Sequence, residues 1–483
     1  MTHYTKQISF FSTIAFILCS LWLSGQTVRI SDEVNIRNDY SYDLLGDINS
    51  NIVLFRDSGK KKYIDVFDEK LSHKYQRELR LEKDNVLFHG VIPFDTCFHM
   101  LYSYSEKDSV HTVLRKLDDT GATLDTVRLF TTEKKDKLLK FEMMSNNAKT
   151  HSLLYAYHKS EGFKFILLDH HRKKIIFTSI VEWEKIDFND EFVSIDLSDD
   201  LYIFILLEQN NKKGEMEDHY FDLTVLDTKT KSQANQKILV SNQISIDAQG
   251  NYDPVNKQYV ITGLYNEKSS AHSKGLFFSR SKLPLKEEFI TAEFIPHSVS
   301  FLKEVYGRKK KKLENLEHHV IQDVLFNLDG GFVVFSEYAK TFTRKSSYQT
   351  YSQMGGRRGL GAWTDHHMEE IGILAISPAG ELRWKNVLHK NQFSQDDGAA
   401  FSSFYLFSTP SILRIVFNEE IKNNNLVSEY LIATNGKSKR SSLLNTEYQN
   451  LKLRFREAIQ LTNKAFLVPS EKSNLLKLVK ISY

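Results

Sequence analysis

The residues best suited to chemistry gather in one segment of the chain, which runs from position 340 to position 370. Four glycines, between positions 355 and 361, lie there among arginine, tyrosine and tryptophan residues. Guanidinium groups and aromatic rings suit an anionic or saccharide-like ligand or a protein partner, whereas glycines leave the backbone permissive. A recognition element and a mobile loop without its own ligand are both compatible with this composition. The predicted binding residues are Tyr348, Tyr351, Arg357, Arg358 and Trp363.

A histidine pair with acidic neighbours ends the same segment. Asp365, His366, His367 and Glu369 offer the nitrogen and oxygen ligands that transition metals accept. However, the HExxH spacing of zinc proteases is absent, and adjacent histidines recur elsewhere in the chain. Solvated or hydrogen-bonded histidines are therefore favoured, and no metal or cofactor is predicted. His366 and His367 remain candidate binding residues.

A third candidate is the sequence Asp396-Asp397-Gly398. Two adjacent carboxylates could bind a divalent cation together with backbone carbonyls, or act as a general acid and base. A turn that starts the next strand explains the same residues more simply, because aspartate and glycine are typical turn residues. Asp396 and Asp397 are included among the candidate binding residues.

Signatures of catalysis are weak. The chain has no GxSxG elbow, and Cys97 lies in an apolar context that predicts an inert core thiol. Propeller glycosidases pair two carboxylates across a central funnel. The Ser-x-Asp-x-Gly-x-Thr-Trp boxes of sialidase-like propellers are absent here. A noncatalytic protein is favoured, and a carbohydrate-active hydrolase or lyase with funnel carboxylates is the alternative.

The elements that must position these residues form a repeat. Four apolar runs end at Asp68, Asp118, Asp169 and Asp227, which are 50, 51 and 58 positions apart. A period near 50 residues is typical of a four-stranded propeller blade and longer than the repeat of a helical solenoid. Each run is predicted to be the third strand of its blade. The fold class is therefore all-β, a β-propeller with WD40-like repeat architecture.

The ends of the chain are predicted to close the ring. Seven units can be followed along the chain, and an eighth, from Leu453 to Tyr483, has only three strands. The segment that starts at Thr27 supplies the missing strand, and its pairing with the C-terminal strands removes two exposed sheet edges. This gives eight four-stranded blades. Seven blades, with one unit paired irregularly, and two stacked β-sandwiches remain alternatives.

Blade topology places the candidate residues on one face. In an antiparallel blade, the loop between the second and third strands emerges at the same end as the connections between blades. The long insertion at about 340–370 in blade six therefore shares a face with the connections 295–317 and 389–398. Loops longer than ~12 to 15 residues in a compact domain are usually functional or disordered. This face is the predicted binding surface.

The first 25 residues have the order of a secretory signal peptide: Lys6, an apolar stretch from position 8 to 23, and the small pair Ser24-Gly25. A retained membrane anchor is the alternative, although the apolar core is shorter than the ~20 residues that span a bilayer. No other transmembrane segment is expected. Residues 26–483 are predicted to form one domain, because no linker rich in proline and glycine divides them. The balance of 64 Lys plus Arg against 61 Asp plus Glu argues against nucleic-acid binding.

Part of the chain resembles a known group of proteins. The stretch DGGFVVFSEY from Asp329, the stretch from Gly372 to Gly398 and the stretch ILRIVFNEEIKNNN from Ile412 are similar to uncharacterised exported propeller-like proteins of the Bacteroidetes. The similarity covers roughly residues 300 to 430 and includes Trp384 and Gln392. It implies an envelope protein without an assigned reaction and carries no catalytic residues to transfer. The predicted location is periplasmic or associated with the outer membrane, with secretion as an alternative. The predicted partner is a protein or glycan of the envelope, bound through the face that carries the long loops.

Overall fold

The structure is a computed structural model, and 12 stretches of the chain are described. The predicted signal peptide, residues 1–25, lies outside them. The described residues are 26–133, 141–158, 162–183, 191–212, 214–240, 242–268, 272–307, 314–345, 362–419, 421, 426–446 and 450–483.

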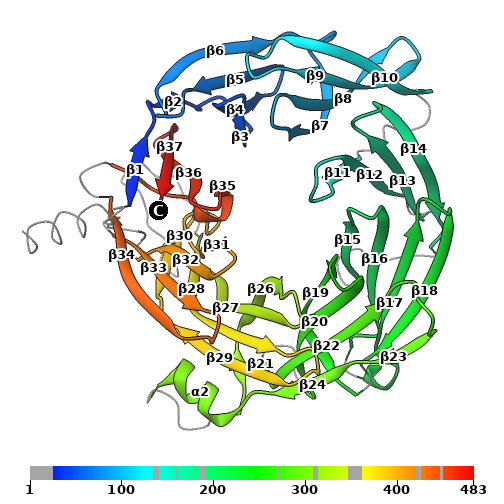
Figure 1. Ribbon diagram of the computed structural model, residues 1–483, viewed down its shortest axis with the longest axis vertical. Coiled ribbons are helices and arrows are strands. Elements are labelled where there is room, and N and C mark those ends of the chain that lie inside the picture. The colour runs from blue at the N-terminus through cyan, green and yellow to red at the C-terminus, as the bar shows by residue number, and fades with distance from the viewer. Residues whose placement is uncertain are drawn as a thin grey trace, which may run out of the picture.

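The protein is an eight-bladed β-propeller, in which eight antiparallel sheets form a ring (Figure 1). In every blade the strands follow one another from the centre of the ring outward. The first four blades contain β3 (Ser41–Ile48), β4 (Asn51–Ser58), β5 (Lys61–Phe67) and β6 (His73–Leu79); β7 (Val86–Pro93), β8 (Phe98–Glu106), β9 (Ser109–Leu117) and β10 (Thr123–Glu133); β11 (Glu142–Ser145), β12 (His151–His158), β13 (Gly162–Asp169) and β14 (Lys174–Val181); and β15 (Phe192–Leu197), β16 (Tyr202–Gln209), β17 (Tyr220–Asp227) and β18 (Ser232–Leu239).

The remaining four blades continue the same order. They contain β19 (Ile244–Asp253), β20 (Gln258–Asn266), β22 (Gly275–Lys282) and β24 (Glu293–Pro296); β26 (His319–Phe326), β27 (Phe332–Lys345), β28 (Ala362–Ile376) and β29 (Leu382–Leu388); β31 (Tyr405–Ser408), β32 (Ile412–Asn418), β33 (Leu426–Ala433) and β34 (Ser438–Asn445); and β35 (Ile459–Thr462), β36 (Ala465–Lys472), β37 (Leu475–Ser482) and β1 (Thr27–Ile30). Short elements lie between them: β2 (Val34–Asn35), the 3-10 helix η1 (Met216–Asp218), β21 (His272–Ser273), β23 (Phe289–Thr291), α2 (Val299–Tyr306), β25 (Leu316–Glu317), β30 (Gln392–Gln395) and the 3-10 helix η3 (Phe455–Glu457).

The two ends of the chain close the ring, as the sequence predicts. β1 pairs antiparallel with β37, Thr27 opposite Ser482, and β2 extends the same pairing with Val34 opposite Leu476. The last blade thus takes its outer strand from the beginning of the chain (Figure 1). The prediction of eight blades and of closure by the terminal strands is confirmed.

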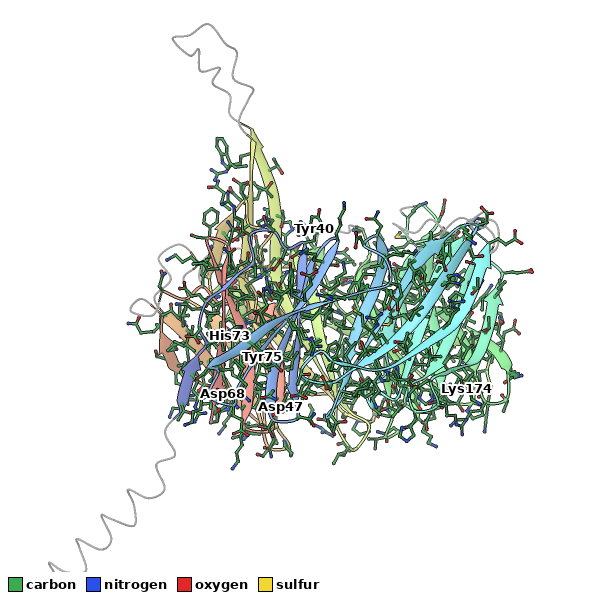
Figure 2. The ribbon with its side chains drawn as sticks, turned by 90° about the horizontal axis from the view of Figure 1, so that it is seen from above. Tyr40, Asp47, Asp68, His73, Tyr75 and Lys174 are labelled. Carbon is green, nitrogen blue, oxygen red and sulfur yellow. The ribbon has the colours of Figure 1, made fainter. Side chains whose placement is uncertain are left out.

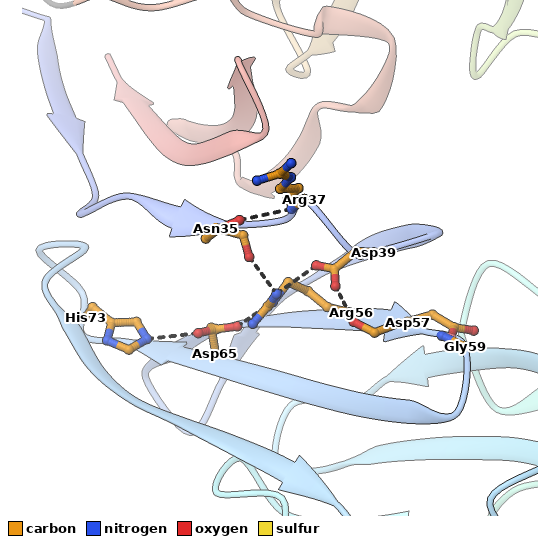
Figure 3. Close-up of polar contacts among 9 residues, drawn as sticks. Asn35, Arg37, Asp39, Arg56, Asp57, Gly59, Asp65 and His73 are labelled. Carbon is orange, nitrogen blue, oxygen red and sulfur yellow. Dashed lines mark hydrogen bonds and ion pairs between the residues drawn. The ribbon is translucent and has the colours of Figure 1, made fainter.

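A buried ion network fixes the N-terminal segment to blade one as well (Figure 3). The Arg56 guanidinium lies 2.7 Å from both Asp39 and Asp65, and it donates a 3.0 Å hydrogen bond to the Asn35 carbonyl. Each of the three charged side chains is at most 5% exposed. His73 hydrogen-bonds the second oxygen of Asp65 at 2.9 Å. The segment that follows β1 is therefore held by the first blade and the last.

The repeating aspartates form the turns between the third and fourth strands. Oδ1 of each carboxylate accepts hydrogen bonds from two backbone N–H groups, two to four residues further along, at 2.8 to 3.2 Å. Such side-chain-to-backbone bonds favour a turn over continued strand. The four residues are Asp68, Asp118, Asp169 and Asp227.

The core lies between the blades. On β4, Leu54 packs with Leu467 of the last blade, whereas its neighbour Phe55 packs with Met100 of blade two. All four side chains are fully buried. Because both faces of a central strand are covered, such strands read as continuous apolar runs, and burying each large side chain contributes roughly 1.5 to 3 kcal/mol.

Four of the innermost strands are not revealed by the sequence. Sequence patterns predict the central and outer strands and the innermost strands β15, β26, β31 and β35, but miss β3, β7, β11 and β19. Bulges interrupt the inner strands of six blades, and one extra residue disturbs the alternation of apolar and polar positions. The shifts fall between Leu44 and Gly46, Phe88 and Gly90, Phe192 and Ser194, Ser245 and Asp247, Ile321 and Asp323, and Gln460 and Thr462.

The outer strand of blade five is split. Residues 287–294 read as one continuous strand, but β23 leaves blade five and pairs in parallel with β18 of blade four, Phe289 opposite Lys237. β24 then returns to blade five. The split ties the two blades together at their outer edge.

The connection 295–317 also differs from its predicted place. α2 begins after Ser298, whose hydroxyl accepts a hydrogen bond from the N–H of Phe301, and it lies at the outer edge of the ring beside β29 (Figure 1). A Cβ at Gly372 of β28 would lie 2.9 Å from Cζ of Phe301, so glycine is required for this packing. Among the described residues of this connection, those of β25 return to the predicted binding face, where β25 pairs with β21 in the loop between the second and third strands of blade five.

Candidate functional site

The candidate site is a β-ribbon that leaves blade six. β27 and β28 remain paired beyond the sheet, from Ala339 opposite Met368 to Lys345 opposite Ala362, and Figure 2 shows them rising from one side of the ring. The segment 340–370 is therefore strand at both of its ends and not loop throughout. We call residues 339–345 and 362–368 the ribbon.

The structure brings some of the predicted binding residues together and leaves others outside its description. Trp363, His366 and His367 lie on the β28 side of the ribbon. Asp396 and Asp397 follow β30, which pairs with the ribbon. Tyr348, Tyr351, Arg357 and Arg358 lie outside the described residues.

β30 makes the base of the ribbon three-stranded. It pairs with β28 from Asp365 opposite Gln395 to Met368 opposite Gln392. The Gln395 amide donates a 3.1 Å hydrogen bond to Asp365, which is 1% exposed and forms a 2.5 Å ion pair with Arg344 of β27. An isolated two-stranded ribbon is at best marginally stable, and β30 adds the third strand that independent stability requires.

One side of the ribbon carries aromatic and cationic groups. These groups lie together because residues directly opposite each other in a strand pair point to the same side. The rings of Phe342 and His367 stack with centroids 5.6 Å apart, and His367 contacts Phe393 of β30 at 5.0 Å. Further out, the Arg344 guanidinium lies 5.8 Å from the centre of the Trp363 ring. We call these five residues the ribbon face.

The other side of the ribbon is hydroxylic. The Thr341 hydroxyl hydrogen-bonds Nδ1 of His366 at 3.0 Å, and Thr343 lies 3.2 Å from Thr364. His366 is thus a hydrogen-bonded histidine, in agreement with the interpretation that the sequence favours. Among the described residues, no group of three or more His, Cys, Asp or Glu side chains is placed to hold a metal ion.

A buried ion pair anchors the base of the ribbon. Nζ of Lys390 lies 2.6 Å from Oε1 of Glu337 on β27, and both side chains are 0% exposed. Lys390 also donates to the Met368 carbonyl of β28 at 3.0 Å, and the Ser403 hydroxyl donates to Glu337 at 2.6 Å. Burial lowers the pKa of Lys390, and the charge of Glu337 opposes that effect. The pair joins both ribbon strands to the entry of blade seven.

Sequence reasoning misses this anchor. Glu337 and Lys390 are 53 positions apart, and neither stands in a pattern that separates it from an exposed charge. The one available signal is the position of Glu337 within the apolar strand FVVFSEY. Charged residues are almost never fully buried unless they are paired, so such a position predicts a partner without naming it.

Asp396 and Asp397 act as turn residues. The carboxylate of Asp396 accepts the Thr364 N–H at 2.7 Å, and its own N–H donates to the Thr364 carbonyl at 2.9 Å. Asp397 accepts the Ala399 N–H at 3.0 Å and the Ser394 hydroxyl at 2.7 Å. These contacts fit the turn interpretation, and they attach the turn to the ribbon.

Three buried carboxylates on the inner strands, where the hydrolase alternative needs its acids, have structural partners. Burial raises the pKa of Asp196, Asp247 and Asp323. Asp196 accepts the Tyr259 hydroxyl at 2.9 Å, and Asp247 accepts the N–H of Ile321 in the next blade at 2.5 Å. The N–H of the residue after Asp323 bonds its carboxylate at 2.8 Å. The hydrogen bonds of Asp196 and Asp247 link neighbouring strands and blades.

Comparisons with known proteins establish similarity of fold alone. No family model and no curated protein matches the chain. Among solved structures, the chain is similar to BamB from Moraxella catarrhalis, with a TM-score of 0.39 and 10% identity over 95% of this chain and 100% of that chain. It is also similar to a quinohemoprotein alcohol dehydrogenase from Pseudomonas putida HK5, with a TM-score of 0.41 and 8% identity over 94% and 76% of the two chains.

A third similar structure is the β-propeller domain of the Trilobed protease from Pyrococcus furiosus, with a TM-score of 0.35 and 10% identity over 86% of this chain and 97% of that domain. Similarity at these scores carries no argument about activity. The propeller assignment rests on the sheet topology. None of the described helices is long and apolar enough to cross a membrane.

Proposed function

We propose that this protein is a noncatalytic scaffold of the cell envelope that binds a protein partner through the ribbon face. The observation that carries the proposal is the fixed attachment of the ribbon to the ring by the Lys390–Glu337 pair and by β30. An ordered ribbon presents its side chains without first losing the conformational freedom of a loop, and that loss is a main cost of binding.

The length of the ribbon supports the same conclusion. β27 has 14 residues and β28 has 15, whereas β26 and β29, their neighbours in the blade, have 8 and 7. Only the part of β27 and β28 that lies within the blade is needed to pair with β26 and β29. The remainder adds aromatic and cationic surface outside the ring.

The chemistry of the ribbon face suits a protein. Tryptophan and arginine are enriched among the residues that dominate protein interfaces. Arg344 is half exposed, although it pairs with Asp365, and Phe342 is 38% exposed. A glycan is the other ligand that such groups could bind. Export to the envelope is part of the proposal and rests on the predicted signal peptide.

Affinity capture from the native envelope fraction tests the proposal. We expect Trp363→Ala to lose the captured protein partner, with a loss of ~2 kcal/mol or about 30-fold in affinity, because a large aromatic anchor is removed. Thr343→Ala, on the hydroxylic side of the same ribbon, is the matched control and should capture the partner as the wild type does.

Two outcomes would contradict the proposal. Equal capture by wild type and Trp363→Ala would show that the ribbon face is not the binding surface. Capture that disappears after enzymatic removal of glycans from the fraction would show a glycan ligand. Location is tested separately, by cell fractionation and by sequencing the N-terminus of the mature chain, which we expect at Gln26.

A further inference from the structure

A pocket of about 560 Å³ lies between blades two and three, on the face opposite the ribbon. Its walls come from the turn between β7 and β8, the turn between β11 and β12, and the turn between β13 and β14. Figure 2 shows Asp47, Asp68 and Lys174, which lie in or beside such turns, at the side of the ring away from the ribbon. The lining residues that matter for its chemistry are Phe94, Cys97, His99, Lys116, His170 and Arg172.

A buried hydrogen-bonded chain ends at this pocket. Nδ1 of His99 lies 2.9 Å from Nδ1 of His170, and Nε2 of His170 lies 2.7 Å from the Ser152 hydroxyl. The three residues are between 0% and 5% exposed. Only one of the two facing Nδ1 atoms can carry the hydrogen, so the tautomers of the two rings are coupled. No described residue hydrogen-bonds Nε2 of His99, which leaves this atom available to a ligand as donor or as acceptor.

The wall beside the chain is aromatic. The Phe94 ring lies 4.6 Å from the His99 ring and 5.3 Å from the His170 ring, measured between centroids. The lining is mostly apolar. Apolar and aromatic walls with a few well-placed polar groups are typical of sites for small molecules. A flat organic group would pack against this wall.

The charged side chains that line the pocket include Lys116, Arg172 and Asp169. Lys116 forms no ion pair with any described residue, although Asp125 stands opposite it in the strand pairing, whereas Arg172 lies 3.6 Å from Asp169 and Lys173 pairs with Asp125. Burial, together with the charges of Lys116 and Lys173, lowers the pKa of His99 to about 4. The ring of His99 is therefore neutral at pH 7, and the unpaired cation at the pocket is Lys116.

We propose that this pocket binds a small organic anion with a flat, unsaturated body. Its carboxylate pairs with Lys116, its ring or conjugated chain packs on Phe94, and a polar group bonds Nε2 of His99. This inference is independent of the function proposed for the ribbon, because the two surfaces lie on opposite faces of the ring.

Benzoate is a suitable probe, and benzamide is its neutral counterpart of the same shape. In calorimetric titrations of the mature chain, we expect benzoate to bind and benzamide to bind at least about tenfold more weakly. Lys116→Ala should weaken benzoate binding by about tenfold. Lys464→Ala removes an exposed lysine near the turn between β35 and β36, away from the pocket, and should bind benzoate as the wild type does. No benzoate binding, equal binding of the two probes, or unchanged binding by Lys116→Ala would overturn the proposal.

A measurement on the unaltered chain tests the site directly. Cys97 lines the pocket, so a bound ligand should shield its thiol from iodoacetamide. Benzoate at ten times its dissociation constant leaves about one pocket in eleven empty. The labelling rate of the peptide that contains Cys97 should therefore fall about tenfold, as followed by mass spectrometry. An unchanged labelling rate at that concentration would place benzoate elsewhere and would also overturn the proposal.

Discussion

The ribbon and the pocket place their buried titratable groups in opposite electrostatic states. At the base of the ribbon, Lys390 and Glu337 are buried as a charged pair at 2.6 Å. At the pocket, His99 and His170 are buried as neutral rings bonded to each other at 2.9 Å. A buried charged pair is stable only while both charged partners are present. Buried neutral imidazole rings are stable only while they remain unprotonated. The two sites therefore fail under different conditions.

Glu337→Ala should give the largest effect. The substitution leaves Lys390 buried without its partner, and breaking a buried pair in this way costs ~3 to 5 kcal/mol. The double variant Glu337→Leu with Lys390→Met removes both charges and should recover most of that loss. Urea unfolding of both variants measures the free energy of unfolding.

Glu78→Ala is the matched control for that experiment. It breaks the exposed pair between Lys61 and Glu78 at 2.9 Å, in which the side chains are 58% and 43% exposed. Exposed pairs contribute ~0 to 1 kcal/mol, so little change is expected. A loss below ~1 kcal/mol for Glu337→Ala as well would show that the anchor does not stabilise the ring.

Acid should destabilise the protein in part through the two pocket histidines, alongside the buried His297 and His319 of blades five and six, whose pKa values are lowered to about 4 and about 3. Burial, together with His99 and His151, lowers the pKa of His170 to about 3, and burial with Lys116 and Lys173 lowers the pKa of His99 to about 4. The unfolded chain takes up protons near pH 6.5, so more protons bind to the unfolded state below that pH and stability falls as pH falls. Each histidine costs about 1.4 kcal/mol per pH unit until its folded pKa is reached.

Thermal unfolding at pH 7.5, 6.5 and 5.5 measures this loss. We expect a loss of only about 0.4 kcal/mol per histidine between pH 7.5 and 6.5 and a steep loss below. His170→Asn keeps a polar group beside Nδ1 of His99 and removes one titrating ring. It should therefore show a shallower dependence below pH 6.5 than the wild type. The same slope in both proteins would mean that His170 is not held neutral by the fold.

The sequence predicts the frame of the molecule and much less of its two sites. The central strands are readable because both of their faces are buried, and the turns are readable because Asp68 and its three counterparts bond the backbone locally. Four inner strands are not readable: bulges interrupt β3, β7 and β19, and β11 has only four residues. The ends of the ribbon are predicted as loop, since polar residues such as Thr341 and Thr343 do not show the pattern of a half-buried strand.

Both buried pairs depend on contacts between distant parts of the chain. His99 and His170 are 71 positions apart and meet only because blade two packs on blade three. Cys97 is buried, as its apolar context predicts, and burial raises the pKa of its thiol, yet it lines a pocket rather than the centre of a core. A repeat period gives the number of blades but not the side chains that face each other between them.

The smallest expected effect is on the ribbon itself. Asp365→Asn removes the charge that pairs with Arg344 at 2.5 Å, and because Arg344 is half exposed the global loss should stay below ~1 kcal/mol. The local effect should be larger, since the same carboxylate also accepts a hydrogen bond from Gln395 of β30. We expect amide hydrogen exchange of residues 341–344 and 363–367 to accelerate while the ring amides keep their rates. Asp329→Asn, which breaks the exposed pair with Arg383 at the far end of blade six, is the control and should leave the ribbon amides unchanged. If Asp365→Asn accelerates exchange in the ring as strongly as in the ribbon, the ribbon is not a separately anchored unit, and its contrast with the pocket fails.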